Sequence, residues 1–161
     1  RGVSEAAADK AVEKLGFGSK KSDSRETPIW GGDMSSFDKF IADAMNNLNG
    51  AFSDNSKQHL LATYGSKYNE IIELGTDDST LLQTISDDSD VIKAEIIFGI
   101  RNEMAQTLTD MMMRRTELGT AEKASEAQIS AVADLMANEL CWSKEQKNDE
   151  INNYIQLYEF K

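Results

Sequence analysis

The sequence predicts an all-α protein, built as an irregular orthogonal bundle of about six to eight short helices. Residues that favour helices, chiefly Ala, Leu, Met, Glu, Lys and Gln, occur throughout the 161 positions, and only one proline is present. Alternation of apolar β-branched residues with polar ones, which is typical of strands, is nearly absent. Glycines separate the apolar patterns, so we expect short helices joined by tight turns.

Net charge and cysteine content exclude several classes of protein. The chain has 28 acidic and 17 basic residues and a net charge of -11, which repels phosphate backbones, so nucleic acid is not an expected partner. The single cysteine, Cys141, cannot form an intrachain disulfide and favours a reducing compartment. No apolar run approaches the roughly 20 residues that cross a bilayer. Because the first residue is Arg1 and not methionine, we expect an excerpt from a longer protein.

The first 33 residues differ from the rest of the chain. A short helix is expected over residues 4–15, with Ser4 as its N-cap and a glycine after its end. Residues 17–33 are rich in Gly, Ser, Lys and Asp, which is the composition of a linker. Ile29 and Trp30 are expected to rest on a neighbouring surface, because exposing such a pair is costly. The predicted organisation is a terminal helix over 1–16, a linker over 17–33 and a helical domain over 34–161.

Helical patterns recur in the first part of this domain. A serine cap, Ser35 or Ser36, precedes the first pattern. Two further helices are expected over 55–64 and 66–74, each followed by a glycine, and a short turn of helix is expected near 81–85. The residues expected to face the core are Phe37, Phe40, Ile41, Ala44, Leu48, Leu60, Leu61, Tyr64, Tyr68, Ile71 and Ile72.

The stretch 91–120 combines apolar residues with paired opposite charges more densely than any other, so we expect it to be the buried centre. Its first helix should start near Asp90 and has almost no wholly polar face, as expected of a helix enclosed by others. A break is expected near Gln106, because Thr107 and Asp110 have the spacing of a reciprocal N-terminal cap. The three methionines that follow are expected to pack in the core, although they could also line a peptide groove.

Two further helices complete the domain. The first is expected over 122–140, with a clear apolar face. Ser143 should cap the second, and Gln146, three positions later, should complete a reciprocal cap. The residues expected to face inward are Ile129, Val132, Ala133, Met136, Leu140, Ile151, Tyr154, Ile155 and Tyr158.

The sequence predicts no catalytic, cofactor-binding or metal-binding residue in this chain. His59 is the only histidine and no Glu-x-x-His pair occurs, so it is expected to be a partly buried residue on a helix surface. Cys141 lies beside Trp142 without an electropositive neighbourhood and is expected to pack. Acidic pairs such as Asp77 and Asp78 lack the glycine of a calcium loop and should cap turns. No glycine-rich phosphate loop is present.

A charge cluster lies within the least polar part of the chain. It comprises Arg101, Glu103, Asp110, Arg114 and Arg115. Buried arginines need carboxylates, and Asp110 lies four residues before Arg114 on the same helix face. We therefore expect these groups to form an internal brace of ion pairs. In the alternative, one arginine binds a phosphate or a partner domain, since a planar guanidinium suits bidentate contacts.

These charges also belong to a longer pattern over residues 95–118. It contains Glu95, Arg101, Glu103, Thr107, Asp110, Arg114, Arg115 and Thr116. The pattern resembles the signature of the C-terminal helical domain of FAD-dependent, respiratory glycerol-3-phosphate dehydrogenases. The Tyr64-Gly65-Ser66 turn and the segment LMANELCW at 135–142 are also similar to that family. The eight residues are therefore candidates for structural or interdomain contacts.

The resemblance implies a parent enzyme that oxidises sn-glycerol 3-phosphate to dihydroxyacetone phosphate and passes electrons through FAD to a quinone. In that family the flavin and substrate residues lie in the N-terminal part, so none is expected here, and residues 1–16 are similar to the helix that closes that part. The implied partners are the missing flavin domain and, as an option, a second copy in a homo-oligomer. The parent is expected to be cytoplasmic, with only peripheral contact to the inner face of the cytoplasmic membrane.

A hypothesis from another class stays open beside this one. The chain could be a freestanding helical interaction module, whose acidic surface and methionine-rich face hold a basic or amphipathic partner. The Arg-Arg-Thr string with its upstream acidic pattern favours the dehydrogenase domain. The interaction module would instead require an intact start codon and no upstream domain.

Overall fold

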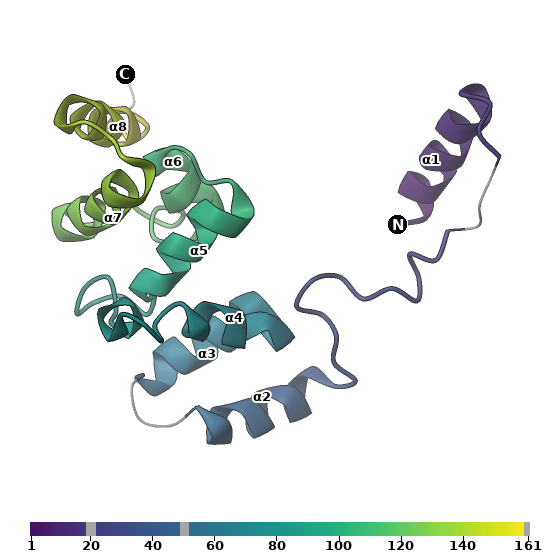
Figure 1. Ribbon diagram of the computed structural model, residues 1–161, viewed down its shortest axis with the longest axis horizontal. Coiled ribbons are helices and arrows are strands. Elements are labelled where there is room, and N and C mark those ends of the chain that lie inside the picture. The colour runs from purple at the N-terminus through teal and green to yellow at the C-terminus, as the bar shows by residue number, and fades with distance from the viewer. Residues whose placement is uncertain (19–21, 49–51, 160–161) are drawn as a thin grey trace. The chain divides into compact units, whose positions relative to one another are not determined.

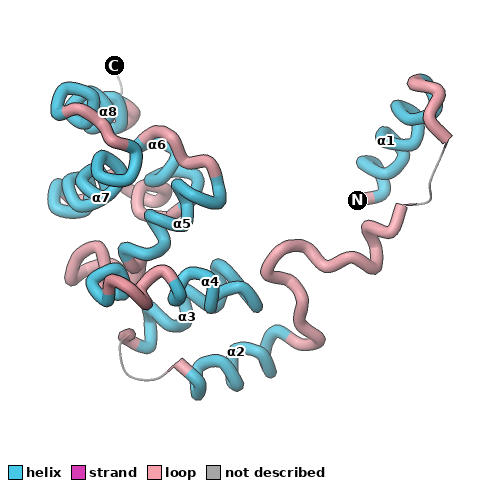
Figure 2. The backbone as a smooth tube through the Cα atoms, viewed as in Figure 1, coloured by secondary structure: helices cyan, strands magenta, loops and turns pink. Residues whose placement is uncertain are grey.

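The computed structural model describes residues 1–18, 22–48 and 52–159, and it confirms the all-α class. Figures 1 and 2 show helices joined by loops, and no strand occurs within these three ranges. The only strand-like pairing described there is an isolated antiparallel bridge between Thr84 and Ile92. The chain forms two compact units, residues 1–33 and 34–161, which are described separately below.

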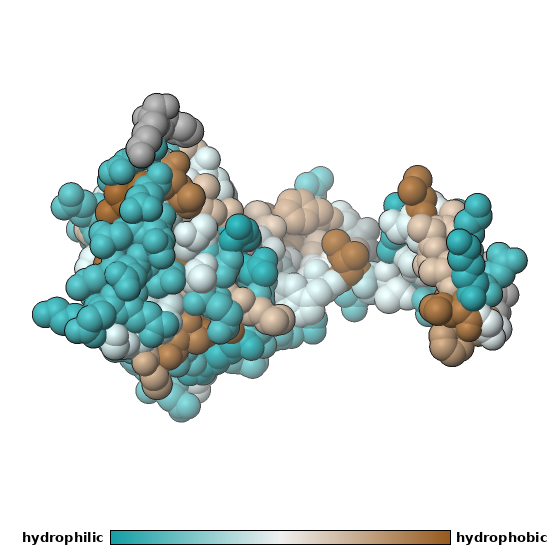
Figure 3. All heavy atoms as spheres, turned by 90° about the horizontal axis from the view of Figure 1, so that it is seen from above, coloured by the Kyte–Doolittle hydropathy of each residue, from teal (hydrophilic) through white to brown (hydrophobic). Residues whose placement is uncertain are grey.

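The first unit contains one helix, α1 (Gly2–Lys14), among its described residues. The predicted cap is wrong, because the helix already begins at Gly2 and no side chain caps its first turn. None of its residues is buried, and Figure 3 shows apolar groups on the visible face of this unit. Ile29 and Trp30 are 75% and 49% exposed.

The second unit opens with a group of short helices close to the predicted positions, except that the turn predicted near 81–85 lies at 79–82 and does not include Ile85. They are α2 (Phe37–Asn47), α3 (Asp54–Tyr64), the 3-10 turn η1 (Gly65–Lys67), α4 (Tyr68–Glu73) and the 3-10 turn η2 (Ser79–Leu82). The hydroxyl of Ser36 caps α2 by accepting the Lys39 N–H, as predicted. Gly65 ends α3 with a φ of 55°, a conformation that glycine adopts without steric cost. The glycine predicted to end α2 lies outside the described residues.

The remaining elements are α5 (Lys93–Glu103), α6 (Leu108–Asp110), the π-helix η3 (Met111–Arg115), α7 (Glu126–Leu140) and α8 (Lys144–Gln156). Helix α7 begins later than predicted, because Ser125 and Gln128 form the reciprocal cap that starts it. Helix α5 also begins later, because the bridge to Thr84 holds Ile92 in extended backbone. None of the described helices is both long and apolar enough to span a membrane.

Helix α5 is the buried centre that the sequence predicts. Every residue from 94 to 100 is buried, and Figure 1 shows the helix between α3 and α4 on one side and α6 and α7 on the other. Ala94 and Phe98 pack with Leu60 and Tyr64 in one cluster. Ile96 and Ile100 belong to a second cluster with residues of α6, η3, α7 and α8. Two cores thus share one helix, which explains why α5 lacks a polar face.

The segment after α5 differs from the prediction of an ordinary helix. Thr107 and Asp110 form the predicted reciprocal cap, but only one α-turn follows before the backbone widens into the π-helix. The Thr116 N–H bonds the Met111 carbonyl at 2.9 Å, five residues back, and the Thr116 hydroxyl bonds the same oxygen. Met111 and Met112 are fully buried, which confirms their predicted packing role. Gly99 of α5 leaves room for Met111, whose methyl carbon lies 2.8 Å from the position of an added Cβ.

Two residues predicted to face the interior lie at the surface. Phe37, the first residue of α2, is 51% exposed, because only the later turns of that helix reach the core residues of α3. Cys141 is also exposed, so its predicted packing role is wrong. It ends α7 in the left-handed conformation with a φ of 55°.

Ser143 provides a test of helix capping. Its hydroxyl accepts the Gln146 N–H at 3.1 Å, as predicted, but the reciprocal bond from the Gln146 side chain is absent among the described contacts. Ser143→Ala is expected to lower the free energy of unfolding by about 1 kcal/mol, because one N–H of the first turn loses its partner. Urea unfolding measures this loss. Ser130→Ala, at an exposed position within α7, is the matched control, and an equal midpoint for both variants would contradict the prediction.

Candidate functional site

The eight residues singled out by the sequence lie on α5 and on the segment 107–116. Only Glu95 and Thr116 are buried, at 2% and 9% exposure. The side chains of Arg101, Arg114 and Arg115 are 53%, 60% and 37% exposed, so the prediction of buried arginines is wrong. The apolar residues of α5 and η3 occupy the core, and the guanidinium groups therefore extend to the surface, where water hydrates them.

Each of these arginines nevertheless has a carboxylate partner. Arg101 donates to both carboxylate oxygens of Glu139 on α7, at 2.5 and 3.0 Å. This hydrogen bond raises the pKa of Arg101 and lowers the pKa of Glu139. Arg114 pairs with Asp110 one turn earlier, as the spacing predicts. The pair between α5 and α7 was not predicted, because its members are 38 residues apart.

The end of the π-helix is tied to the end of α5. Arg115 donates its Nε–H to the Glu103 carbonyl at 3.0 Å, and the Glu103 carboxylate lies 3.9 Å from the same nitrogen. Burial raises the pKa of Glu103, although the nearby Arg115 opposes this shift. Asp110 behaves differently: burial alone would raise its pKa, but hydrogen bonds from Thr107 and from the backbone outweigh burial and lower it.

A histidine that the sequence did not connect to this cluster lies beside it. Helix α3 directs the His59 ring between two carboxylates, with Nε2 3.0 Å from Oε2 of Glu95 and Nδ1 3.3 Å from Oε1 of Glu117. The second oxygen of Glu95 accepts the Ile92 N–H at 2.8 Å and so caps α5. The hydrogen bond to Glu95 raises the pKa of His59 against the opposing effect of burial. His59 is partly buried on the surface of α3, as the sequence predicts.

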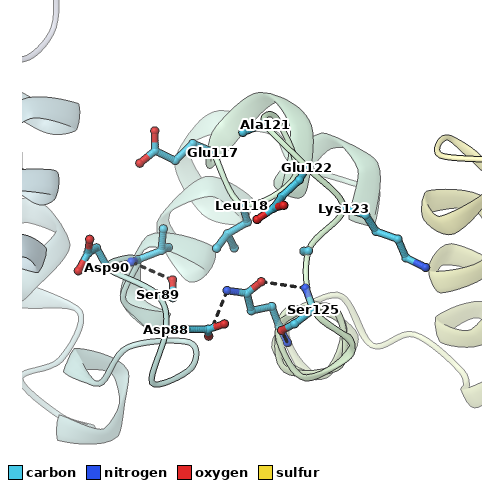
Figure 4. Close-up of a pocket in the computed structure, with 12 residues that line it drawn as sticks. Asp88, Ser89, Asp90, Glu117, Leu118, Ala121, Glu122, Lys123 and Ser125 are labelled. Atoms are coloured by element: carbon cyan, nitrogen blue, oxygen red, sulfur yellow. Dashed lines mark hydrogen bonds between the residues drawn. The ribbon is translucent and has the colours of Figure 1, made fainter.

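Three surface cavities surround this histidine and the turn that follows η3. One, of about 290 Å³, is lined by His59, Thr63, Met113, Arg114, Arg115, Thr116, Glu117 and Thr120, and we call it the arginine cavity. A second, of about 490 Å³, is also lined by His59 and includes Asp90 and Glu117. The third, of about 460 Å³, lies between the loop 88–91 and the start of α7. Figure 4 shows the third cavity, with the carboxylates of Asp90 and Glu117 on the same side.

The residues that line these cavities suit the binding of charged groups. Within the described residues no group of three or more His, Cys, Asp and Glu side chains could hold a metal ion. The arginine cavity is lined by two arginines, one histidine, several threonines and Glu117. Such planar cations suit bidentate contacts to carboxylates or phosphates.

Comparison with known proteins decides the family. Residues 22–147 match the family model described as the C-terminal domain of alpha-glycerophosphate oxidase. The chain belongs to this family. The match includes all eight predicted residues together with His59, Glu117 and the three cavities, whereas α1 lies outside it.

Relatives of this alpha-glycerophosphate oxidase C-terminal domain carry the name glycerol-3-phosphate dehydrogenase. The protein from Synechocystis is 25% identical over 160 residues, which is 99% of this chain and 29% of that protein. The mitochondrial protein from Bos taurus is 32% identical over 99 residues, 58% of this chain and 14% of its own length. The probable mitochondrial protein from Dictyostelium discoideum is 28% identical over 97 residues, 60% of this chain and 15% of its own length.

This domain therefore spans less than a third of each of these relatives. The matches confirm the predicted resemblance to the C-terminal domain of glycerol-3-phosphate dehydrogenases. Their names all describe oxidoreductases of glycerol 3-phosphate, and the domain corresponds to a C-terminal part of such proteins.

Proposed function

We propose that this domain is a non-catalytic accessory part of an FAD-dependent glycerol-3-phosphate dehydrogenase. In this proposal the parent oxidises sn-glycerol 3-phosphate to dihydroxyacetone phosphate and passes electrons through FAD to a quinone. The flavin and the substrate are bound by the N-terminal part, which this chain does not contain. Support comes from the family match and from relatives of which the chain spans 14 to 29%.

The observation that carries the accessory role is the placement of the arginines. All three arginines of residues 34–161 lie on α5 or at the end of η3, and each is at least 37% exposed. Their carboxylate partners hold them in place, but a guanidinium has five N–H donors. In the described part of the chain, Arg114 donates to Asp110 and Arg115 donates to the Glu103 carbonyl. Other edges of both groups are therefore available to a partner.

The partner proposed for this surface is the flavin domain of the parent. An arginine that is already oriented by a carboxylate loses little conformational freedom when it binds a second acidic group. Three other residues would support the contact indirectly. Glu95 caps α5, Thr107 caps the start of α6, and Thr116 bonds the Met111 carbonyl at the end of the π-helix. A second copy of the chain is the competing occupant of the same surface.

The location of the parent follows from the proposed electron acceptor. A quinone is dissolved in a membrane, so we propose that the parent is cytoplasmic and contacts the inner face of the cytoplasmic membrane peripherally. The relatives from Bos taurus and Dictyostelium carry a mitochondrial designation instead. Fractionation of cells that produce the full-length parent, followed by a salt wash of the membranes, would test this location.

The accessory role predicts distinct behaviour of the isolated chain and of its arginine variants. The purified chain is expected to bind no FAD and to reduce no dye acceptor with glycerol 3-phosphate, as followed by flavin absorbance and dye bleaching. Arg114→Lys is expected to weaken association with a separately produced flavin domain about tenfold, because a bidentate contact becomes a point charge. Isothermal calorimetry measures this association.

Lys144→Gln is the matched control for the arginine variant, because it changes an exposed positive residue at the start of α8, away from η3. It should leave the association unchanged. Stoichiometric FAD binding with dye reduction by the isolated chain would overturn the non-catalytic role. Equal association of wild type and Arg114→Lys would show that the arginine surface is not the contact. Dimerisation that is lost in Arg114→Lys, seen by light scattering, would assign the surface to a second copy.

A further inference from the structure

The two ring nitrogens of His59 both face carboxylates. Nε2 lies 3.0 Å from Glu95 on α5, and Nδ1 lies 3.3 Å from Glu117 in the turn after η3. An ionised carboxylate only accepts hydrogen bonds, and a neutral imidazole has a proton on one nitrogen only. Both contacts are therefore favourable only when His59 is an imidazolium. A neutral ring would turn a lone pair towards one of the two anions.

We propose that His59 is a proton-operated latch, whose imidazolium holds Glu117 against α3 and whose deprotonation releases that carboxylate. The cavities around Glu117 then change in charge and shape. At low pH the arginine cavity contains the imidazolium together with Arg114 and Arg115. At high pH it has lost that positive charge, and its one carboxylate is no longer held.

The burial of the two carboxylates decides which contact is lost. The Glu95 side chain is 1% exposed and also accepts the Ile92 N–H, so leaving it unpaired would be costly. A neutral His59 can keep its proton on Nε2 and continue to donate to Glu95. The Glu117 side chain is 74% exposed, so water can replace His59 as its partner. Deprotonation therefore breaks the contact with Glu117.

The other charged and titratable groups around His59 come from α5, from the loop before it and from the segment after it. From the loop before α5, Asp90 adds a negative charge that favours the imidazolium. Behind Glu95, Tyr64 stays neutral, because burial raises the pKa of its hydroxyl. Glu103 is the next carboxylate on α5, and Arg114 and Arg115 face His59 across the arginine cavity. The hydrogen bond to Glu95 raises the pKa of His59 above its ordinary 6.5, so the latch opens as pH rises through this raised pKa.

Glu117 lines all three cavities, so its release would affect each of them. Figure 4 shows its side chain directed towards the side of Asp90 and away from Ala121 and Glu122. A change in the position of this one carboxylate thus alters surfaces on α3, on η3 and at the start of α7.

The test is a pH titration of the full chain by NMR, and it is unambiguous because His59 is the only histidine. Below the midpoint both ring nitrogens are expected to carry protons, and the midpoint is expected above 6.5. The Nε–H signals of Arg114 and Arg115 should shift with the same midpoint, since Glu117 moves beside them. In Glu117→Gln the His59 midpoint should fall towards 6.5, and the arginine signals should no longer follow it.

Glu122→Gln is the matched control, because it removes the same charge from an exposed residue of the third cavity without touching His59. It should behave like wild type. His59→Gln should abolish the shared midpoint of the arginine signals. A wild-type midpoint at or below 6.5, identical titrations of Glu117→Gln and Glu122→Gln, or arginine signals that ignore the His59 midpoint would each overturn the latch.

Discussion

Glu95→Ala is expected to lower the free energy of unfolding by about 3–5 kcal/mol, the usual cost of removing one partner of a buried ion pair. Three groups depend on this carboxylate. The Ile92 N–H loses the acceptor that caps α5, His59 loses its nearest anion, and the buried Tyr64 hydroxyl loses its hydrogen bond with Glu95. Urea unfolding at pH 6, monitored by circular dichroism, would measure the loss.

The controls distinguish the effect of removing a buried carboxylate from the effect of removing a negative charge beside His59. Glu117→Ala removes the exposed partner of the same histidine and is expected to cost less than about 1 kcal/mol, as exposed ion pairs do. A double-mutant cycle with His59→Gln should show coupling between Glu95 and His59. A loss for Glu95→Ala no larger than that for Glu117→Ala would contradict the argument.

The sign of the pH dependence follows from the raised pKa of His59. The folded state binds this proton more tightly than the unfolded state does, so the imidazolium contributes stability that is fully present below 6.5. That contribution is lost as pH rises through the folded-state pKa. The difference between wild type and Glu95→Ala should therefore be larger at pH 6 than at pH 9.

Gly119→Ala is expected to lower the free energy of unfolding by about 1–3 kcal/mol, the cost of overpacking a filled core. A Cβ at this position would lie 2.6 Å from the Tyr154 hydroxyl, 2.9 Å from the Tyr158 hydroxyl and 3.0 Å from the Met113 sulfur. These atoms cannot move away cheaply. Tyr154 is fully buried, and Tyr158 donates its hydroxyl proton to the Gly119 carbonyl. Thermal unfolding measures the effect.

Two comparisons make the Gly119 prediction specific. Gly18→Ala is the control, since a Cβ there meets no atom within 4 Å, and its melting temperature should match that of wild type. Tyr158→Phe removes one of the crowding hydroxyls, so the double variant should lose less stability than the sum of the two single variants. Strict additivity, or an unchanged melting temperature in Gly119→Ala, would show that the turn has room for a methyl group.

Local signals in the sequence determined the class of the fold and most helix positions. Capping residues such as Ser36, Ser143 and the pair Thr107 and Asp110 act within one turn, so their bonds follow from spacing alone. The apolar residues of α5 continue around the whole helix, and the structure confirms that other helices enclose it. The family pattern over 95–118 likewise lies in one continuous stretch, where it could be compared directly.

Contacts between distant segments were decided only by the tertiary structure. His59 meets Glu95 across 36 residues and Arg101 meets Glu139 across 38, and no local pattern specifies such pairs. At the start of the π-helix, Met111 packs against Gly99 of α5, and its carbonyl accepts the Thr116 N–H and hydroxyl. The same packing directs Arg114 and Arg115 outward, although their apolar surroundings in the sequence predicted burial. Side-chain direction depends on how whole helices pack together, and that arrangement is set by the two cores on either side of α5.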